Sequence, residues 1–229
     1  MNLRFQGAAF DLEGTLVDLE SAHHLGHLDA AAEVGLDLSL EEAVRDIPAF
    51  VGGPDIEIAK AIQARVRQPV DLEHLLARMK FHYYFHRQRL DVRVRSGFDH
   101  VLSNVQRLGV LTCLGSATEK AEGLELLRQT RLMDHFPNER LVFAEDVISR
   151  KPAPDVYLET ARRMKIKPSQ QIVFEDSVPG ILAAVAAGST VVAIPVFKQE
   201  AFLKRLKSAG AIQICRNWDD VDARKLCII

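Results

Sequence analysis

The chain has 229 residues, of which 48% are hydrophobic and 26% are charged. This length and balance exclude a disordered chain and predict one large hydrophobic core, or a core with a smaller second domain. The formal net charge is -2, and lysines and arginines are dispersed along the chain, so we expect no nucleic-acid partner.

Cysteine usage and hydropathy give expectations about the compartment. Cys113, Cys215 and Cys227 are an odd number without Cys-x-x-Cys spacing, so the sequence supports neither a disulfide framework nor a thiolate zinc site. We find no signal peptide and no segment that approaches about 18 uncharged apolar residues. We therefore expect a cytoplasmic protein that does not associate with membranes.

Short apolar runs rich in β-forming residues recur along the chain and predict strands. The runs are Phe5–Phe10, Val110–Leu114, Leu141–Phe143, Ile172–Phe174, Val191–Val196 and Ile212–Cys215. Segments with helical periodicity lie between most of them, among them Ala121–Leu132, Asp155–Met164 and Gly180–Ala187. Strands that alternate with helices predict an α/β fold with a parallel sheet covered on both faces.

One long stretch, from Leu19 to about Arg93, departs from this alternation and has a helical pattern without a convincing strand pair. Its helix candidates, interrupted by Gly52-Gly53-Pro54 and by Pro69, are Glu20–Val34, Leu40–Phe50, Asp55–Arg67 and Leu72–Leu90. We expect residues 19–93 to form a helical domain inserted into a core made of residues 1–18 and 94–229.

The first predicted strand leads into the motif Phe10-Asp11-Leu12-Glu13-Gly14-Thr15-Leu16-Val17-Asp18. This motif places the Asp11 carboxylate at the end of a strand and a glycine in the turn that follows. The carboxyl ends of parallel strands are where α/β proteins bind ligands. Asp11 is therefore the first candidate catalytic residue.

Three further polar motifs each follow a predicted strand. After the second run, Ser116 offers a hydroxyl and Ala117 a backbone amide, and such groups can hold an anion. After the third run, Lys151 supplies a cation at a helix start that prolines define. Glu175 and Asp176 follow the fourth run and offer the oxygen ligands that suit Mg²⁺.

Each of these side chains also has an ordinary structural interpretation. A serine after a strand is commonly a helix N-cap, a single lysine is commonly solvated, and an acidic pair can favour a helix start. Their combination favours a site, because a carboxylate, a hydroxyl, a lysine and an acidic pair would each end a different parallel strand. Such groups converge on one edge of the sheet.

This ordered set of motifs resembles the haloacid dehalogenase superfamily over the whole chain. The tract from Ala144 to Asp155, with Val173–Ser177 and Gly180-Ile181, is similar to the branch that contains β-phosphoglucomutases and sugar-phosphate phosphatases. The resemblance implies a Rossmann-like core, a helical cap domain inserted after the first motif, and Mg²⁺ as cofactor.

The resemblance also implies roles for the site residues. Asp11 would attack phosphorus, while Ser116 and Lys151 would hold the phosphoryl oxygens. Asp11, the backbone carbonyl of Glu13 and Asp176 would bind the metal, with Glu175 as a further candidate ligand. The implied substrate is a small phosphorylated metabolite such as a sugar phosphate, and we expect a monomer or weak dimer. Positioning and charge neutralisation of this kind are what phosphoryl transfer requires.

Glu13 departs from the family motif, which has a second aspartate at this position. In the family that aspartate protonates the leaving oxygen and then draws a proton from the water that opens the aspartyl-phosphate. Glutamate has suitable acidity, since its reference pKa of about 4.3 is close to the value of about 3.9 for aspartate. Its extra methylene moves the carboxylate, and a misplacement of roughly 1 Å can cost about a hundredfold in rate. We therefore predict a slow or a repositioned acid/base.

Histidines in the helical insert leave their roles open. His23 lies where this branch often carries a histidine facing the leaving group, so it is either a substrate-binding residue or an ordinary helix residue. His23 with His27, and His82 with His86, have the i, i+4 spacing that can bind a transition metal. The sequence shows no nearby third ligand for either pair.

The leading hypothesis is a Mg²⁺-dependent phosphatase, and three alternatives stand beside it. A β-phosphoglucomutase is disfavoured by Asp55, which stands where such mutases carry an arginine that grips a second phosphate. A metal-independent dehalogenase is disfavoured because it does not need the acidic pair Glu175-Asp176. The third alternative is a catalytically silent binding or regulatory protein that has lost turnover at Glu13.

Overall fold

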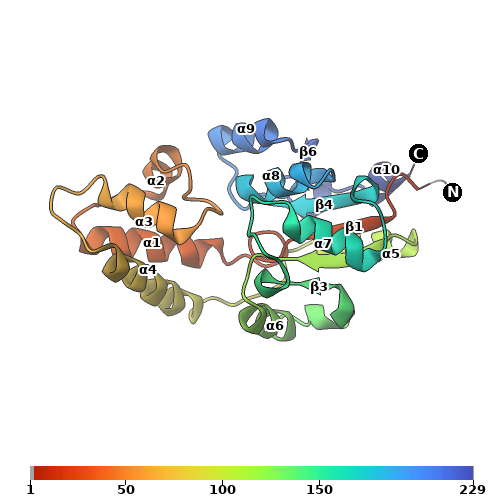
Figure 1. Cartoon of the computed structure of the whole chain (residues 1–229), viewed down its shortest axis with the longest axis horizontal. Coiled ribbons are helices and arrows are strands. Elements are labelled where there is room, and N and C mark those ends of the chain that lie inside the picture. Colours follow the sequence, from red (N-terminus) through yellow and green to blue (C-terminus); the bar gives the residue numbers. More distant parts are fainter. Residues whose placement is uncertain (1–2, 229) are drawn as a thin grey trace. The chain divides into compact units, whose positions relative to one another are not determined.

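The structure is a computed structural model, and it describes residues 3–228. The chain forms two compact units (Figure 1). The sheet unit contains the described residues up to Asp18 and from Val92 onward, and the helical unit is Leu19–Asp91. Residues 92 and 93, which we expected in the insert, thus belong to the sheet unit.

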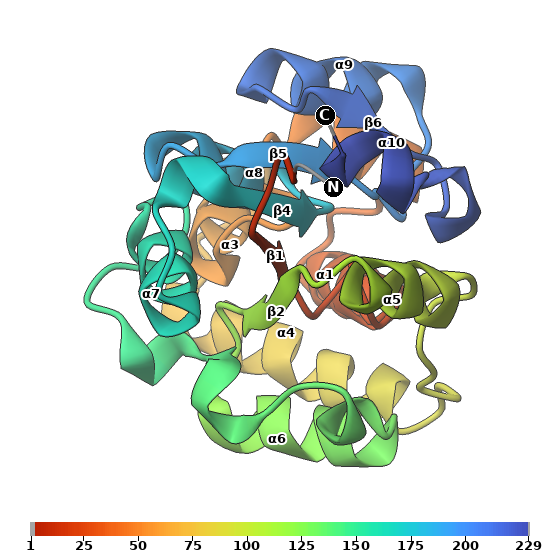
Figure 2. The same cartoon turned by 90° about the vertical axis from the view of Figure 1, so that its right-hand side faces the viewer.

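The sheet unit is built on six parallel strands in the order β3-β2-β1-β4-β5-β6 (Figure 2). The strands are β1 (Gly7–Phe10), β2 (Leu111–Gly115), β3 (Leu141–Val142), β4 (Gln171–Glu175), β5 (Thr190–Ala193) and β6 (Gln213–Ile214). All of the predicted strands are confirmed, and no bound differs by more than three residues. The predicted α/β class and parallel sheet are confirmed as well.

Helices cover both faces of this sheet (Figure 2). α7 (Asp155–Met164) and α8 (Val178–Ala186) lie on one face, and α5 (Phe98–Arg107) and α10 (Ala223–Cys227) lie on the other. The remaining α-helices of the described sheet unit are α6 (Lys120–Gln129) and α9 (Glu200–Ala209).

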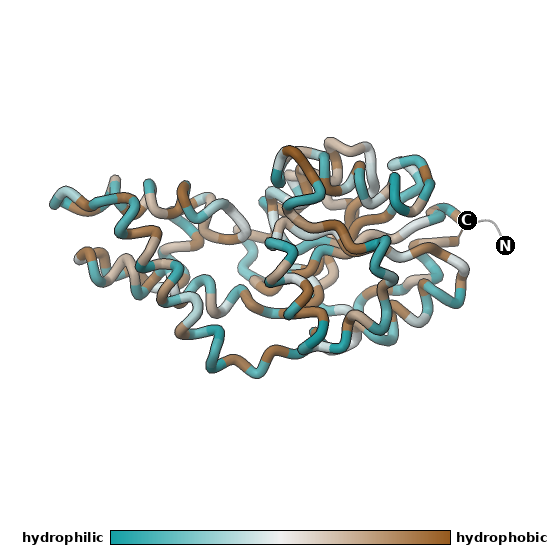
Figure 3. Tube along the Cα trace, turned by 60° about the horizontal axis from the view of Figure 1, so that its bottom comes forward, coloured by the Kyte–Doolittle hydropathy of each residue, from teal (hydrophilic) through white to brown (hydrophobic). Residues whose placement is uncertain are grey.

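Aromatic side chains anchor the end of the central strand. Phe10, the last residue of β1, stacks on Phe174 with ring centroids 5.1 Å apart. It also contacts Phe98 edge-on and Trp218 at a tilted angle. Apolar segments follow the strands through the middle of this unit (Figure 3). The register pairs Phe10 with Leu114 on β2 and with Phe174 on β4. The residues that follow these three strands therefore emerge at one edge of the sheet.

The helical unit contains α1 (Glu20–Glu33), α2 (Leu40–Asp46), α3 (Asp55–Gln63) and α4 (Leu72–Arg87), and its described residues include no strand. All four predicted helices are present, with earlier ends. α2 ends at Asp46 because the residue before Pro48 is driven into an extended conformation, which Ile47 adopts.

No helix among the described residues has both the length and the hydrophobicity to cross a membrane.

Candidate active site

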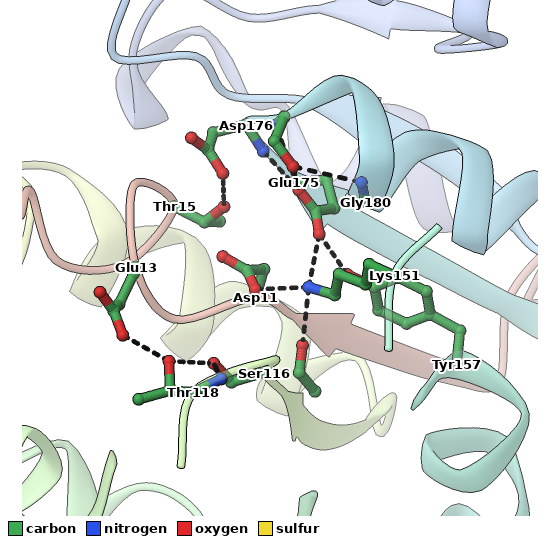
Figure 4. Close-up of polar contacts among 12 residues, drawn as sticks. Asp11, Glu13, Thr15, Ser116, Thr118, Lys151, Tyr157, Glu175, Asp176 and Gly180 are labelled. Atoms are coloured by element: carbon green, nitrogen blue, oxygen red, sulfur yellow. Dashed lines mark hydrogen bonds and ion pairs between the residues drawn. The ribbon is translucent and has the colours of Figure 1, made fainter. Parts of the chain in front are cut away.

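Polar side chains from separate strands meet at the carboxyl edge of the sheet (Figure 4). Asp11 follows β1, Ser116 follows β2, and Glu175 ends β4 with Asp176 after it. These residues are neighbours because β1 pairs with β2 on one side and with β4 on the other. Lys151 reaches the same place from the loop before α7.

Lys151 forms the centre of a buried ionic network. Its Nζ lies 2.6 Å from Asp11 Oδ1 and 2.6 Å from Glu175 Oε1, and it donates to the Gly115 carbonyl at 3.2 Å. Burial opposes the charge of this lysine, but its pKa is raised because the two carboxylates attract the ammonium more strongly. Lys151 is therefore a permanent cation beside Asp11.

The Asp11 carboxyl group is strongly perturbed. Burial raises the pKa of Asp11 to about 7; Lys151 opposes this rise, while the charges of Glu175 and Glu13 add to it. A perturbed carboxyl group within a cluster of charged residues is typical of a catalytic site. The nearby lysine gives this carboxylate its main electrostatic support.

Glu175 holds the network in place. Its Oε1 accepts hydrogen bonds from Lys151 Nζ at 2.6 Å and from the Tyr157 hydroxyl at 2.7 Å. Its Oε2 accepts from the backbone amides of Asp176 and Ser177 at 2.9 and 3.2 Å, and from Ser177 Oγ at 3.1 Å. Burial raises the pKa of Tyr157 well above its usual value, which keeps its hydroxyl a donor.

The acidic residues form a group that could hold a metal ion. Asp11, Glu175 and Asp176 are buried, and each offers a carboxylate oxygen within 4.8 Å of the others. A compact set of hard oxygen donors fits Mg²⁺ and does not favour a metal that prefers nitrogen or sulfur. Both oxygens of Glu175 also accept the hydrogen bonds described above, whereas Asp176 Oδ1 accepts one from Thr15 Oγ1 at 3.2 Å.

Glu13 is connected to the phosphate-holding candidate Ser116 through Thr118. Ser116 Oγ donates to Thr118 Oγ1 at 2.7 Å, and the Thr118 amide donates back to Ser116 Oγ at 3.1 Å. Thr118 Oγ1 in turn donates a short hydrogen bond to Glu13 Oε1. The longer carboxylate arm thus has a fixed partner at the edge of the sheet (Figure 4).

The loop after β1 has a tight backbone. Gly14 has φ +79°, and a Cβ at this position would lie 2.2 Å from Asp176 Oδ2, so only glycine fits. Arg95 donates from its guanidinium to the Gly14 carbonyl, and Trp218 Nε1 donates to the Thr15 carbonyl at 3.1 Å. These contacts fix the backbone around Asp11 and Glu13.

The structure brings most of the predicted site residues together in the sheet unit. These are Asp11, Glu13, Ser116, Lys151, Glu175 and Asp176. Ala117 follows Ser116 and is half-buried, and its role as an anion-binding residue stays a prediction. His23 lies on α1 of the helical unit, where its ring stacks on Tyr83 with centroids 4.0 Å apart; its substrate-binding role also stays a prediction.

Four contributing residues, Thr15, Thr118, Tyr157 and Arg95, were not assigned from the sequence. Thr15 and Thr118 lie inside motifs already identified, so their hydroxyl groups were a usable signal. Arg95 lies 81 residues from its Gly14 partner, and Tyr157 lies 18 residues from Glu175. No local pattern could have indicated these two contacts.

Comparisons with known proteins identify the family of this chain. Residues 8–194 match the family model of haloacid dehalogenase-like hydrolases. The chain is 32% identical over 196 residues to fructose-1-phosphate phosphatase YqaB of Escherichia coli (strain K12), covering 81% of this chain and 94% of that protein. It is 25% identical over 188 residues to a phosphorylated carbohydrates phosphatase of Thermotoga maritima, covering 80% of this chain and 82% of that protein.

Solved structures show the same fold. A haloacid dehalogenase-like protein of unknown function from Agrobacterium tumefaciens superposes with a TM-score of 0.82 at 26% identity, covering 94% of this chain and 95% of that one. A putative beta-phosphoglucomutase from Thermotoga maritima superposes with a TM-score of 0.71 at 24% identity, covering 96% of this chain and 98% of that one. The second likeness concerns the fold alone.

Proposed function

The chain belongs to the haloacid dehalogenase-like hydrolases, and from this premise we propose that it is a Mg²⁺-dependent phosphatase of a small phosphorylated metabolite, such as a sugar phosphate. The observation that carries the proposal is the buried Asp11 carboxylate, 2.6 Å from the Lys151 ammonium and grouped with Asp176 at the sheet edge. The phosphatases of Escherichia coli and Thermotoga maritima described above support the substrate class. The helical unit would serve as the cap domain.

In the first half of the reaction, an Asp11 oxygen attacks the substrate phosphorus. A bond forms between this oxygen and phosphorus, while the bond from phosphorus to the leaving oxygen breaks. Glu13 gives its proton to that oxygen, and an alcohol departs. Lys151 and Ser116, with the Ala117 amide, hold the phosphoryl oxygens and offset their charge.

In the second half, water opens the aspartyl-phosphate. Glu13, now a carboxylate, draws a proton from the water as the water oxygen attacks phosphorus. The bond from phosphorus to Asp11 breaks, which releases inorganic phosphate and restores the free carboxylate. The Thr118 hydroxyl donates to Glu13 and so supports its base form.

The acidic residues would hold Mg²⁺ in this scheme. Asp11, Asp176 and the Glu13 backbone carbonyl are the assigned ligands, with the Glu175 carboxylate beside them. When bound, Mg²⁺ supplies positive charge that neutralises the phosphoryl oxygens. Glu175 orients Lys151 through their 2.6 Å contact, so the lysine and the metal site share one support.

A phosphate-ester panel with Mg²⁺ tests this function, with release of inorganic phosphate as the readout and Asp11→Asn as the blank. We expect the wild type to hydrolyse sugar phosphates and the blank to be inactive. Interconversion of hexose phosphates without phosphate release would instead indicate a mutase. Binding of Mg²⁺ without turnover of any ester would indicate a silent binding protein.

A further inference from the structure

A second group of potential metal ligands lies within the helical unit. His23 and His27 are one turn apart on α1, and Asp55 is the first residue of α3. Each of the three side chains offers one ligand atom, and these atoms lie within 4.8 Å of one another. The fold thus supplies the third ligand that the histidine spacing alone did not reveal.

The geometry of this group is close to that of a coordination site. His27 Nε2 and Asp55 Oδ1 form a hydrogen bond of 3.1 Å, which an ion bound between them would replace. Two ligand atoms of a tetrahedral zinc ion, each bound at about 2.0–2.1 Å, are separated by roughly 3.3 Å.

Aromatic neighbours hold the two imidazole rings. The His23 ring stacks on Tyr83 with centroids 4.0 Å apart and an interplanar angle of 17°. The His27 ring meets the Phe50 ring edge-on, with centroids 5.6 Å apart. Rings fixed in this way lose little further freedom when they bind a ligand, which lowers the entropic cost of binding.

The local charge favours a cation. Glu20 is buried and lies 3.1 Å from His24 Nε2, and Asp55 adds a second carboxylate beside His27. These two carboxylates attract a cation to the histidines beside them.

We propose that the helical unit binds one divalent transition-metal ion, of the class of Zn²⁺ or Co²⁺, through His23, His27 and Asp55. Two imidazole nitrogens and one carboxylate oxygen suit these ions, whereas Mg²⁺ prefers oxygen ligands alone. The ion ties α1 to the start of α3 and leaves a coordination position for water. It is separate from the acidic group of the sheet unit, which contains no nitrogen ligand.

The other histidine pair of the helical unit provides a matched control. His82 and His86 have the same i, i+4 spacing on α4, but His82 Nε2 lies 3.3 Å from Arg78 Nη2 and 2.9 Å from Glu33 Oε1. The Arg78 guanidinium opposes the approach of a dication, and its bond to Glu33 neutralises that carboxylate. Asp29 Oδ2 lies 2.6 Å from His86 Nε2 and 3.7 Å from His82 Nδ1, but with the Arg78 cation beside His82 we expect no comparable ion there.

Co²⁺ titration of the full-length, tag-free chain in excess Mg²⁺ tests the proposal, with the visible d–d absorption and equilibrium dialysis as readouts. We expect one bound equivalent in the wild type. Asp55→Ala and His23→Gln should each weaken the affinity for Co²⁺ by about 10- to 100-fold, while His82→Gln should leave it unchanged. Because the Asp55 side chain is half exposed, we expect Asp55→Ala to fold normally. This variant therefore tests the site even if a substitution on α1 disturbs folding.

The proposal would be overturned by no bound Co²⁺, by an unchanged affinity in Asp55→Ala and His23→Gln, or by loss of the ion in His82→Gln. Asp176→Asn separates this site from the proposed catalytic one. Loss of the Co²⁺ equivalent in Asp176→Asn alone would place the ion in the acidic group and contradict the assignment. The readouts are independent of phosphate release, so they remain informative if the proposed function fails.

Discussion

Glu13 illustrates how one residue can keep a role with an altered geometry. Its carboxylate accepts a hydrogen bond from Thr118, which itself accepts one from Ser116. This support favours the repositioned acid/base over the slow one. We expect Glu13→Gln, which cannot transfer the proton, to lower kcat for phosphate release by about 10²–10⁴-fold. Glu13→Asp should also be slower, because the shorter side chain loses Thr118; a faster aspartate variant would show that Glu13 is a handicap.

Thr118 should act through Glu13. A hydrogen bond to a charged group contributes about 1.5–3 kcal/mol, so Thr118→Val should lower kcat by roughly 10- to 100-fold. In a Glu13→Gln background the same change should cost little more, because the two residues form one unit. Steady-state kinetics of the two single variants and the double variant measure this coupling. Fully additive losses would place the role of Thr118 elsewhere.

Lys151 compensates two buried carboxylates, which gives it a structural role as well. Lys151→Met leaves Asp11 and Glu175 without their cation and should lower the free energy of unfolding by about 3–5 kcal/mol. Adding Asp11→Asn should restore part of this loss, since it removes one of the two charges. Urea unfolding followed by circular dichroism measures both effects. A Lys151→Met variant as stable as the wild type would contradict the ionic network.

At the scale of elements, strands were predictable and long-range contacts were not. The central strands β1 and β4 are buried on both faces, so each appears in the sequence as a short continuous apolar run, such as the one that ends at Phe10. α5 buries Phe98, Val101, Leu102 and Val105, and this i, i+3, i+4, i+7 spacing is visible in the sequence as well. α2 was predicted too long because its apolar pattern continues to Phe50 although Pro48 stops the helix.

Gly14 lies in the turn after β1, where the backbone conformation and the nearby Asp176 leave no room for a side chain. Gly14→Ala places a Cβ against Asp176 Oδ2 and forces a non-glycine residue to adopt φ +79°. We expect this variant to lose stability and to require more Mg²⁺ for half-maximal activity. Gly35→Ala is the control, because Gly35 has φ +83° with no atom within 4 Å of an added Cβ. Equal Mg²⁺ requirements in the two variants would show that Gly14 matters only for backbone strain.

At the scale of the whole molecule, the candidate site was predictable because the strands are parallel. The carboxyl ends of parallel strands meet at one edge of the sheet, and so do the residues that follow them. Placing Asp11, Ser116, Lys151 and Asp176 after separate strands was enough to bring them to one edge. The contact between His27 and Asp55 was not predictable, because it depends on how α3 packs near α1. Once strands pair in a parallel sheet, the positions of the residues that follow them are set by the backbone hydrogen bonds. The packing of two helices depends instead on how their side chains fit together.

The three cysteines report on the integrity of the sheet unit. Cys113, Cys215 and Cys227 are free and buried, and burial raises the thiol pKa of Cys113 to about 12 and of Cys227 to about 11. We expect Ellman's reagent to leave all three thiols unmodified in the native protein at neutral pH and to modify all of them in urea, because the thiolate is the reactive form. Rapid modification of any thiol in the native protein would contradict this packing.

The central claim is that Asp11 carries the phosphoryl group during turnover. Its most direct measurement is mass spectrometry of acid-quenched enzyme after a brief reaction with p-nitrophenyl phosphate and Mg²⁺. The leaving group of this ester needs no proton, so using Glu13→Gln slows only the hydrolysis of the intermediate. We expect one phosphoryl group on the peptide that contains Asp11, sensitive to hydroxylamine and absent from Asp11→Asn. Phosphate release by the wild type with no phosphoryl group on this peptide, or turnover that survives in Asp11→Asn, would contradict the account.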